Sequence, residues 1–214
     1  MINDTVAASA LSAAEAARAV LHNVFAFDDQ HPLLFTQFYF WAFFAIVLLA
    51  LAAIGRSGVL LRNAFLFFVS VFFYYKTSGD FTMLLITATA LSYLVGLRVG
   101  SAVAKVPAGS PAPRRAKLWV GAGVVINLLV LCYFKYAYLV VDMVNQIAGT
   151  SFEVHDYVAE LGNAIFGEGR FSVDYIWLPV GISFYTFQCI SYLMDIYRRR
   201  IEPLRNFINY GFYV

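Results

Sequence analysis

Five long apolar segments divide the sequence, and they constrain its fold more than any other feature. The first segment, Phe35–Ile54, contains no charged side chain, and about 20 apolar residues suffice to cross the ~30 Å hydrocarbon core of a bilayer. The other four are Leu60–Tyr75, Phe81–Val99, Leu118–Val141 and Ile176–Tyr197. The pattern predicts an all-α, polytopic integral membrane protein with about five transmembrane helices.

The composition agrees with this class. Hydrophobic residues make up 61% of the 214 residues and charged residues 13%, whereas soluble domains carry about 25% charged residues. The net charge of +2 is small, and no basic run is interleaved with aromatic residues in a solvated segment, so we expect no nucleic-acid partner. Cys132 and Cys189 lie in apolar runs without metal-ligand spacing, and we assign them no function.

The two ends of the chain differ from the five apolar segments. Residues 1–34 include an alanine-rich stretch, Val6–Phe27, without the basic start of a signal peptide, and we expect it to form an interfacial N-terminal helix. Residues 35–214 would then form the rest of a single membrane domain. The last residues, NFINYGFYV, look like the start of another apolar segment. We expect either a terminal interfacial turn or, preferably, the front part of a longer protein.

Positive charge alternates between the connecting segments. The segments that follow the first, third and fifth apolar segments, together with the adjoining ends of the apolar segments where Arg62 and Arg98 lie, hold 11 of the 15 Lys and Arg residues: Arg56, Arg62, Arg98, Lys105, Arg114, Arg115, Lys117, Arg198, Arg199, Arg200 and Arg205. The segment between the fourth and fifth instead holds six acidic residues: Asp142, Glu153, Asp156, Glu160, Glu168 and Asp174. Because basic loops stay in the cytoplasm, the pattern predicts an external N-terminus and a cytoplasmic Arg198–Arg205 segment.

Polar residues line one side of the fifth apolar segment. At ~100° per helical residue they fall within a sector of about 80°, which we call the polar stripe; its members are Gln188, Ser191, Asp195 and Arg198. Asp195 is expected to pair with Arg198 or Arg199, three or four residues later. The stripe either holds this helix against its neighbours or forms one wall of a tunnel, since polar groups at membrane depth usually face the protein interior or water.

Other polar residues interrupt the same apolar segments. Pro179 and Gly181 predict that the fifth helix starts late or is kinked. Lys135 lies near the outer end of the fourth segment, among tyrosines, and either snorkels to the interface or lines a tunnel. Asn127, nearer the middle, is expected to hydrogen-bond between helices or to line the same tunnel.

The sequence offers no recognisable catalytic or metal site. His22, His31 and His155 lie outside the apolar segments, without a partner at a spacing typical of a triad or a metal site. Motifs such as G-x-S-x-G, H-E-x-x-H and the P-loop are absent. We therefore expect no catalytic residue and no metal ligand in this chain.

Three sequence blocks resemble one family. LPVGISFYTFQCISYLMDIYRRR (178–200) is long and specific, while YFKYA (133–137) and LRNAFLFFVSVFFYYKT (61–77) are weaker signals. Together they resemble the membrane-bound O-acyltransferase (MBOAT) family, in the branch of bacterial alginate O-acetyltransferase and the D-alanyl transfer protein of teichoic acid modification. The resemblance covers residues 35–214 and implies the N-terminal part of an MBOAT helical bundle that surrounds a tunnel.

The resemblance also implies a reaction. Such enzymes transfer an acyl group from a cytoplasmic thioester, acetyl-CoA or an acyl carrier protein, to hydroxyls of a cell-surface polymer; the thioester is a substrate, and no bound cofactor is implied. It implies the bacterial inner membrane and an extracytoplasmic acetyltransferase partner. The family's essential histidine lies in the C-terminal half, and no histidine here matches its context. We therefore expect this chain to need the missing half and to be inactive alone.

Two other interpretations stay open. A kinked helix with a polar stripe also suits half of a transporter or flippase. A non-catalytic membrane scaffold with five spans would need no chemistry at all. The first would be favoured by an inverted repeat of this half, and the second by stable purification of the 214-residue chain alone.

Overall fold

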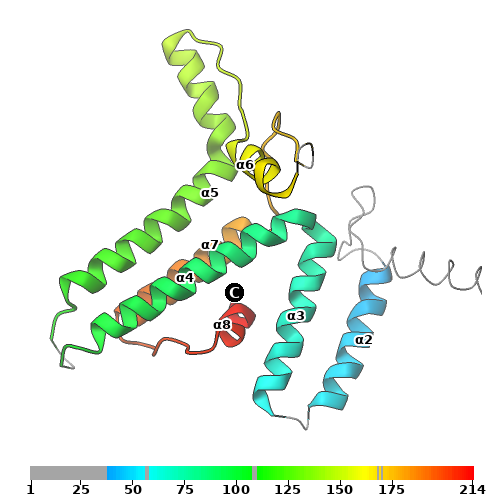
Figure 1. Ribbon diagram of the computed structural model, residues 1–214, viewed down its shortest axis with the longest axis vertical. Helices are drawn as coiled ribbons and strands as arrows, with labels where there is room; N and C mark the ends of the chain where they lie inside the picture. The colour runs from blue at the N-terminus through cyan, green and yellow to red at the C-terminus, as the bar shows by residue number, and fades with distance from the viewer. Residues whose placement is uncertain (1–37, 56–57, 108–109, 168, 170) are drawn as a thin grey trace, which may run out of the picture. The chain divides into compact units, whose positions relative to one another are not determined.

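The computed structural model describes residues 38–55, 58–107, 110–167, 169 and 171–214 (Figure 1). The expected N-terminal helix within residues 1–34, with His22 and His31, lies outside the described residues. The described part contains helices and no strands, which confirms the all-α class. The elements are α2 (Phe38–Ile54), α3 (Val59–Ser78), the 3₁₀ turn η1 (Gly79–Phe81), α4 (Thr82–Val103), α5 (Arg114–Ala148), α6 (Tyr157–Phe166), α7 (Ile182–Tyr197) and α8 (Phe207–Tyr213).

The chain groups into two compact units, one ending at Leu84 and the other running from Leu85 to Val214. In the first unit, α2 and α3 pack through phenylalanine rings: the Phe40 ring lies 5.4 Å from that of Phe73, and the Phe43 ring lies 6.0 Å from that of Phe72. Offset and tilted aromatic pairs at such distances add to simple burial. The expectation of a single membrane domain stays a prediction.

Two stretches are long and apolar enough to cross a membrane: Val59–Val103, which contains α3 and α4, and Arg114–Ala148, which is α5. The helix α2 is apolar but shorter. The expected count of five spans is therefore not established by the described helices. At 35 residues, α5 also extends beyond the predicted segment Leu118–Val141 at both ends.

The helix α7 begins later than the apolar segment that predicted it. It has 16 residues and starts at Ile182, so residues 176–181 are not helical. Gly181 precedes it with a φ of 73°, a left-handed conformation that glycine adopts without steric cost. The buried Pro179 accepts a hydrogen bond from the backbone N–H of Ile182. The late start expected from Pro179 and Gly181 is confirmed, and the predicted start at Ile176 is wrong.

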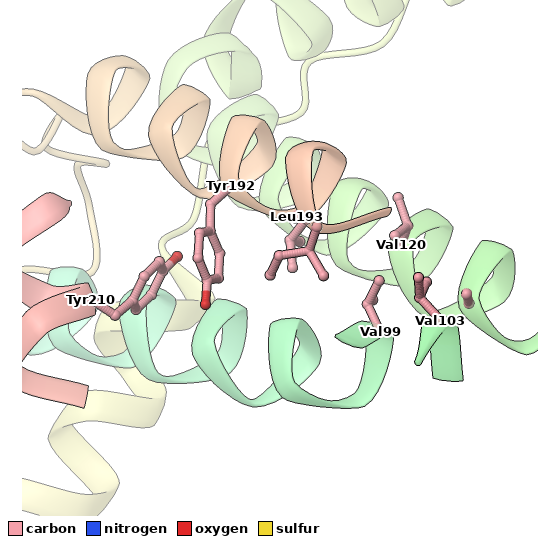
Figure 2. Packing of buried hydrophobic residues seen from close by; sticks show 8 residues of the cluster. Val99, Val103, Val120, Tyr192, Leu193 and Tyr210 are labelled. Atoms are coloured by element: carbon pink, nitrogen blue, oxygen red, sulfur yellow. The ribbon is translucent and has the colours of Figure 1, made fainter. Parts of the chain in front are cut away.

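The core of the second unit lies where α4, α5, α7 and α8 meet. Its buried members are Val99, Val103, Ala116, Val120, Tyr192, Leu193, Ile196 and Tyr210. Figure 2 shows Tyr192 and Leu193 pointing from α7 toward α4, with Tyr210 of α8 beside Tyr192; these two rings lie 4.3 Å apart. Large aromatic side chains thus attach the short α8 to the longer helices.

Glycines bring three of these backbones close together. A Cβ on Gly96 of α4 would lie 2.7 Å from the Tyr192 ring, and one on Gly123 of α5 would lie 2.6 Å from a methyl group of Leu193. A Cβ on Gly100, one turn after Gly96, would lie even closer to the ring of Pro203. Small residues at such spacing are typical of helix contacts in membranes, where they allow close backbone approach.

Candidate functional site: the polar stripe of α7 and its basic end

The polar stripe lies on a different side of α7 from its packing face. The buried residues of the helix are Ile182, Tyr185, Thr186, Cys189, Tyr192, Leu193 and Ile196. On a helical projection the stripe is centred about 140° away from them. Ser191 and Arg198 are exposed, and Gln188 and Asp195 are half-buried. Among the described residues, the stripe is thus not part of the α7 packing face.

Gln188 is the member of the polar stripe that lies nearest to the start of α7. Its Nε2 donates a hydrogen bond to the backbone carbonyl of Tyr213 in α8, at 3.1 Å. Its Oε1 is buried and has no hydrogen-bond partner in the described part of the chain. A buried polar atom without a partner costs roughly 1–3 kcal/mol. The side chain therefore has capacity for one more donor.

Asp195 pairs with a different arginine from the one expected. Its Oδ1 lies 3.5 Å from an Nη of Arg200, five residues later, and not next to Arg198 or Arg199. The helix ends at Tyr197, and Arg199 adopts a left-handed conformation with a φ of 58°. The i+3 and i+4 geometry of a continuous helix is therefore lost, and the reversal of the chain brings Arg200 back to Asp195.

Arg199 joins the end of α7 to the end of α4. Its guanidinium donates to the carbonyl oxygens of Pro107 at 2.8 Å, Val106 at 3.3 Å and Val103 at 3.5 Å. These carbonyls lie at or just after the C-terminus of α4, where a cation is favoured by the helix dipole. Arg199 therefore has a structural role at the basic end, while Arg198, Arg200 and Arg205 remain exposed.

Two substitutions of Arg199 distinguish the contribution of its side chain from that of its left-handed backbone conformation. Arg199→Ala is expected to lower the melting temperature of the protein in detergent, because the three carbonyls lose their hydrogen bonds from the charged guanidinium. Arg199→Gly loses the same donor but removes the left-handed penalty of about 1–2 kcal/mol, so we expect it to melt above Arg199→Ala and below the wild type. Equal melting of Arg199→Ala and the wild type would contradict this role.

Asn127 and Lys135 lie on α5 in different surroundings. The buried Nδ2 of Asn127 donates to Ser92 Oγ of α4 at 3.1 Å and to the Gly123 carbonyl at 2.8 Å. Lys135 is exposed, and its Nζ lies 5.4 Å from the ring centre of Tyr136 on the same helix. The structure therefore places Asn127 at the contact of α5 with α4 and Lys135 on the exposed side of α5.

The junction between α5 and α6 was not predicted from the sequence. Asp156 is 4% exposed, and its Oδ1 accepts hydrogen bonds from Tyr133 Oη at 2.8 Å and from the N–H groups of Val158 and Ala159, both at 3.0 Å. Asp156 is thus the N-cap of α6 and also the tie to α5. An aspartate directly before an amphipathic run is a signal that could have revealed the cap.

His155 has a partner that sequence spacing did not indicate. Its Nε2 lies 3.1 Å from Glu160 Oε2, and both side chains are exposed. Across the described ranges, no group of three or more His, Cys, Asp or Glu side chains could hold a metal ion. The pair is therefore a surface contact at the start of α6.

Comparison with known proteins identifies close relatives. Over 158 residues, 74% of the chain, it is 37% identical to the probable alginate O-acetylase AlgI of Pseudomonas aeruginosa. It is also 37% identical over 153 residues to the probable alginate O-acetylase AlgI of Azotobacter vinelandii. It is 26% identical over 140 residues, 65% of the chain, to the peptidoglycan O-acetyltransferase of Helicobacter pylori.

These matches cover only part of the relatives. The chain spans 26% of the length of each of the two alginate O-acetylases and 21% of the peptidoglycan O-acetyltransferase. No protein-family model and no solved structure matches the chain. The chain is a homologue of the alginate O-acetylases, and the resemblance to that branch of the membrane-bound O-acyltransferases, predicted from three sequence blocks, is confirmed.

Proposed function

We propose that this chain is the N-terminal part of a membrane-bound O-acyltransferase of the bacterial inner membrane. The whole enzyme would transfer an acetyl group from a cytoplasmic thioester to hydroxyls of a cell-surface polysaccharide. The observation that carries this proposal is the 37% identity to alginate O-acetylases over about three quarters of the chain. The acetyl group and the polysaccharide acceptor follow the names of these relatives.

The polar stripe would form part of the wall along which the donor or acceptor moves. Two features support this role: the stripe lies away from the packing face of α7, and the buried Oε1 of Gln188 has no partner in the described part of the chain. The remaining part of the enzyme would cover the exposed members of the stripe, Ser191 and Arg198. It would also supply the histidine that acts as general base on the acceptor hydroxyl.

The basic end of α7 would face the donor. Arg198, Arg200 and Arg205 are exposed, and the charge pattern of the connecting segments favours a cytoplasmic location for them. Exposed arginines attract anionic molecules and raise their local concentration, and both acetyl-CoA and an acyl carrier protein are anionic. An extracytoplasmic acetyltransferase would be the partner on the opposite side of the membrane.

The test uses the full-length protein in cells that make the acetylated polysaccharide. We expect Asp195→Ala and Gln188→Ala to lower the O-acetyl content of the polysaccharide at unchanged protein level. A hydrogen bond to a charged group is worth roughly 1.5–3 kcal/mol, so the rate with Asp195→Ala should fall at least about tenfold.

Arg200→Ala removes the ion pair and leaves the carboxylate in the stripe. Because it also removes one of the exposed arginines of the basic end, Arg205→Ala is its matched control. If Arg200→Ala lost more activity than Arg205→Ala and as much as Asp195→Ala, the carboxylate would act only through the pair. Wild-type acetylation with both stripe variants would assign the stripe a purely structural role. Lack of any O-acetylation by the wild-type protein would remove the enzymatic proposal itself.

A further inference from the structure

The helix α6 carries an apolar surface that points away from the other residues that the structure describes. On this helix Ala159 is buried and Gly162 and Asn163 are half-buried, which defines the packed side. We call the opposite side the α6 apolar stripe; it consists of Tyr157 (68% exposed), Val158 (45%), Leu161 (61%) and Ile165 (65%). At 100° per residue these four side chains fall within a sector of about 100°.

The packed side of α6 is fixed, so this stripe cannot turn inward. Asn163 donates to the Phe171 carbonyl at 2.9 Å and accepts from the Phe171 N–H at 2.8 Å. The Phe171 ring lies so close to Gly162 that a Cβ there would be 2.9 Å from it. Together with the Asp156 cap, these contacts hold α6 at both ends with its apolar residues outward.

Contacts with α5 determine the depth of α6 relative to a bilayer. A helix that enters the membrane after the basic residues Arg114–Lys117 has crossed the ~30 Å core after about 20 residues, which is near Tyr133–Tyr138. Tyr133 Oη donates to Asp156 at the start of α6. Tyr138 Oη accepts from the N–H of Ile176 at 2.9 Å. Both ends of the segment that contains α6 are therefore tied to the same part of α5, beside which α6 lies (Figure 1). By its distance from the basic residues, this part of α5 falls at one membrane–water interface.

The residues around α6 have the composition of such an interface. Beside Ile176, Tyr175 is 63% exposed and Trp177 is 65% exposed, and tyrosine and tryptophan are enriched where headgroups meet the acyl chains. The charged residue Glu160 projects from another side of the helix and contacts His155. Apolar and aromatic residues on one side and charge on another are the pattern of a helix that lies in the interface plane.

We propose that α6 is an interfacial helix whose apolar stripe inserts into the lipid of the leaflet next to Tyr133 and Tyr138. Continuity with the membrane-spanning α5 supports lipid as the occupant, because α6 is attached at the depth where that helix leaves the hydrocarbon core. The helix would hold the 149–181 segment flat on the membrane and fix the entry of α7. This inference rests on the membrane placement of α5 but not on the acyltransferase reaction.

The proposal can be tested with a fluorescent bimane label on single cysteines of the full-length protein in phosphatidylcholine–phosphatidylglycerol nanodiscs. The background carries Cys132→Ser and Cys189→Ala, with any further cysteines replaced. Leu161→Cys and Ile165→Cys place the label on the apolar stripe, and Glu160→Cys is the matched control on the same helix. We expect nitroxide lipids labelled near the headgroup to quench the stripe positions more than position 160. Aqueous iodide should give the opposite order.

Two outcomes would overturn the proposal. Strong iodide quenching at Leu161→Cys and Ile165→Cys, equal to that at Glu160→Cys, would show that the stripe faces water. Protection of the stripe positions from both quenchers would show that a protein surface covers it, either from the rest of the enzyme or from a partner. Neither result depends on O-acetylation, so failure of this proposal is distinguishable from failure of the proposed function.

Discussion

Gly96→Leu is expected to cause the largest loss of stability among the substitutions considered. The first added carbon would lie 2.7 Å from the Tyr192 ring and 3.3 Å from Ile196 Cδ1. Tyr192 cannot move aside easily, because it is 2% exposed and its hydroxyl accepts from the Leu204 N–H at 3.0 Å. Overpacking of this kind costs about 1–3 kcal/mol, which for a chain of this length corresponds to a melting temperature roughly 2–12 °C lower.

Gly121→Leu on α5 is the matched control for this substitution. Nothing lies within 4 Å of a Cβ at Gly121, and the residue is exposed. Leucine is also the better helix former by roughly 0.5–1 kcal/mol, so the control should melt at or slightly above the wild-type temperature. Thermal unfolding in detergent, followed by size-exclusion chromatography, measures both variants. Equal melting of the two would show that α4 and α7 do not approach closely at Gly96.

Asp156→Ala is expected to release α6 from α5. The substitution leaves the Tyr133 hydroxyl and two backbone N–H groups without their acceptor. Loss of an N-cap costs about 0.5–2 kcal/mol, and a hydrogen bond to a charged group is worth roughly 1.5–3 kcal/mol. A local loss of about 2 kcal/mol makes backbone amides of α6 exchange with solvent roughly thirty-fold faster. Hydrogen–deuterium exchange with mass spectrometry on the protein in detergent measures this.

Two control substitutions distinguish the two roles of Asp156, which caps α6 and ties it to α5. Asp156→Asn retains a side-chain oxygen that caps a helix about as well as aspartate, so exchange in α6 should rise much less than with alanine. Tyr133→Phe removes only the tie to α5 and should leave the helix capped. If Asp156→Ala left exchange in α6 unchanged, contacts at Phe171 alone would hold the helix.

Local patterns in the sequence determined the helical class and much of α7. Uncharged runs and their flanking charges depend on the side chains of one segment at a time, so the all-α class follows directly from them. Pro179 and Gly181 also act locally, because each restricts or permits particular backbone angles of its own residue. The late start of α7 at Ile182 could therefore be predicted, although hydropathy alone placed the segment start six residues too early.

Only the tertiary structure decided which residues meet across the chain. The partner of Asp195 is Arg200 because α7 ends at Tyr197 and the chain turns back at Arg199. The roles of Gly96 and Gly123 depend on the side chains of Tyr192 and Leu193, which lie far away in the sequence. In the same way, helical periodicity placed the polar stripe on one side of α7. The packing of α4 and α5 against another side decided that the stripe stays outside the described core, because the burial of a helix face is a property of its neighbours.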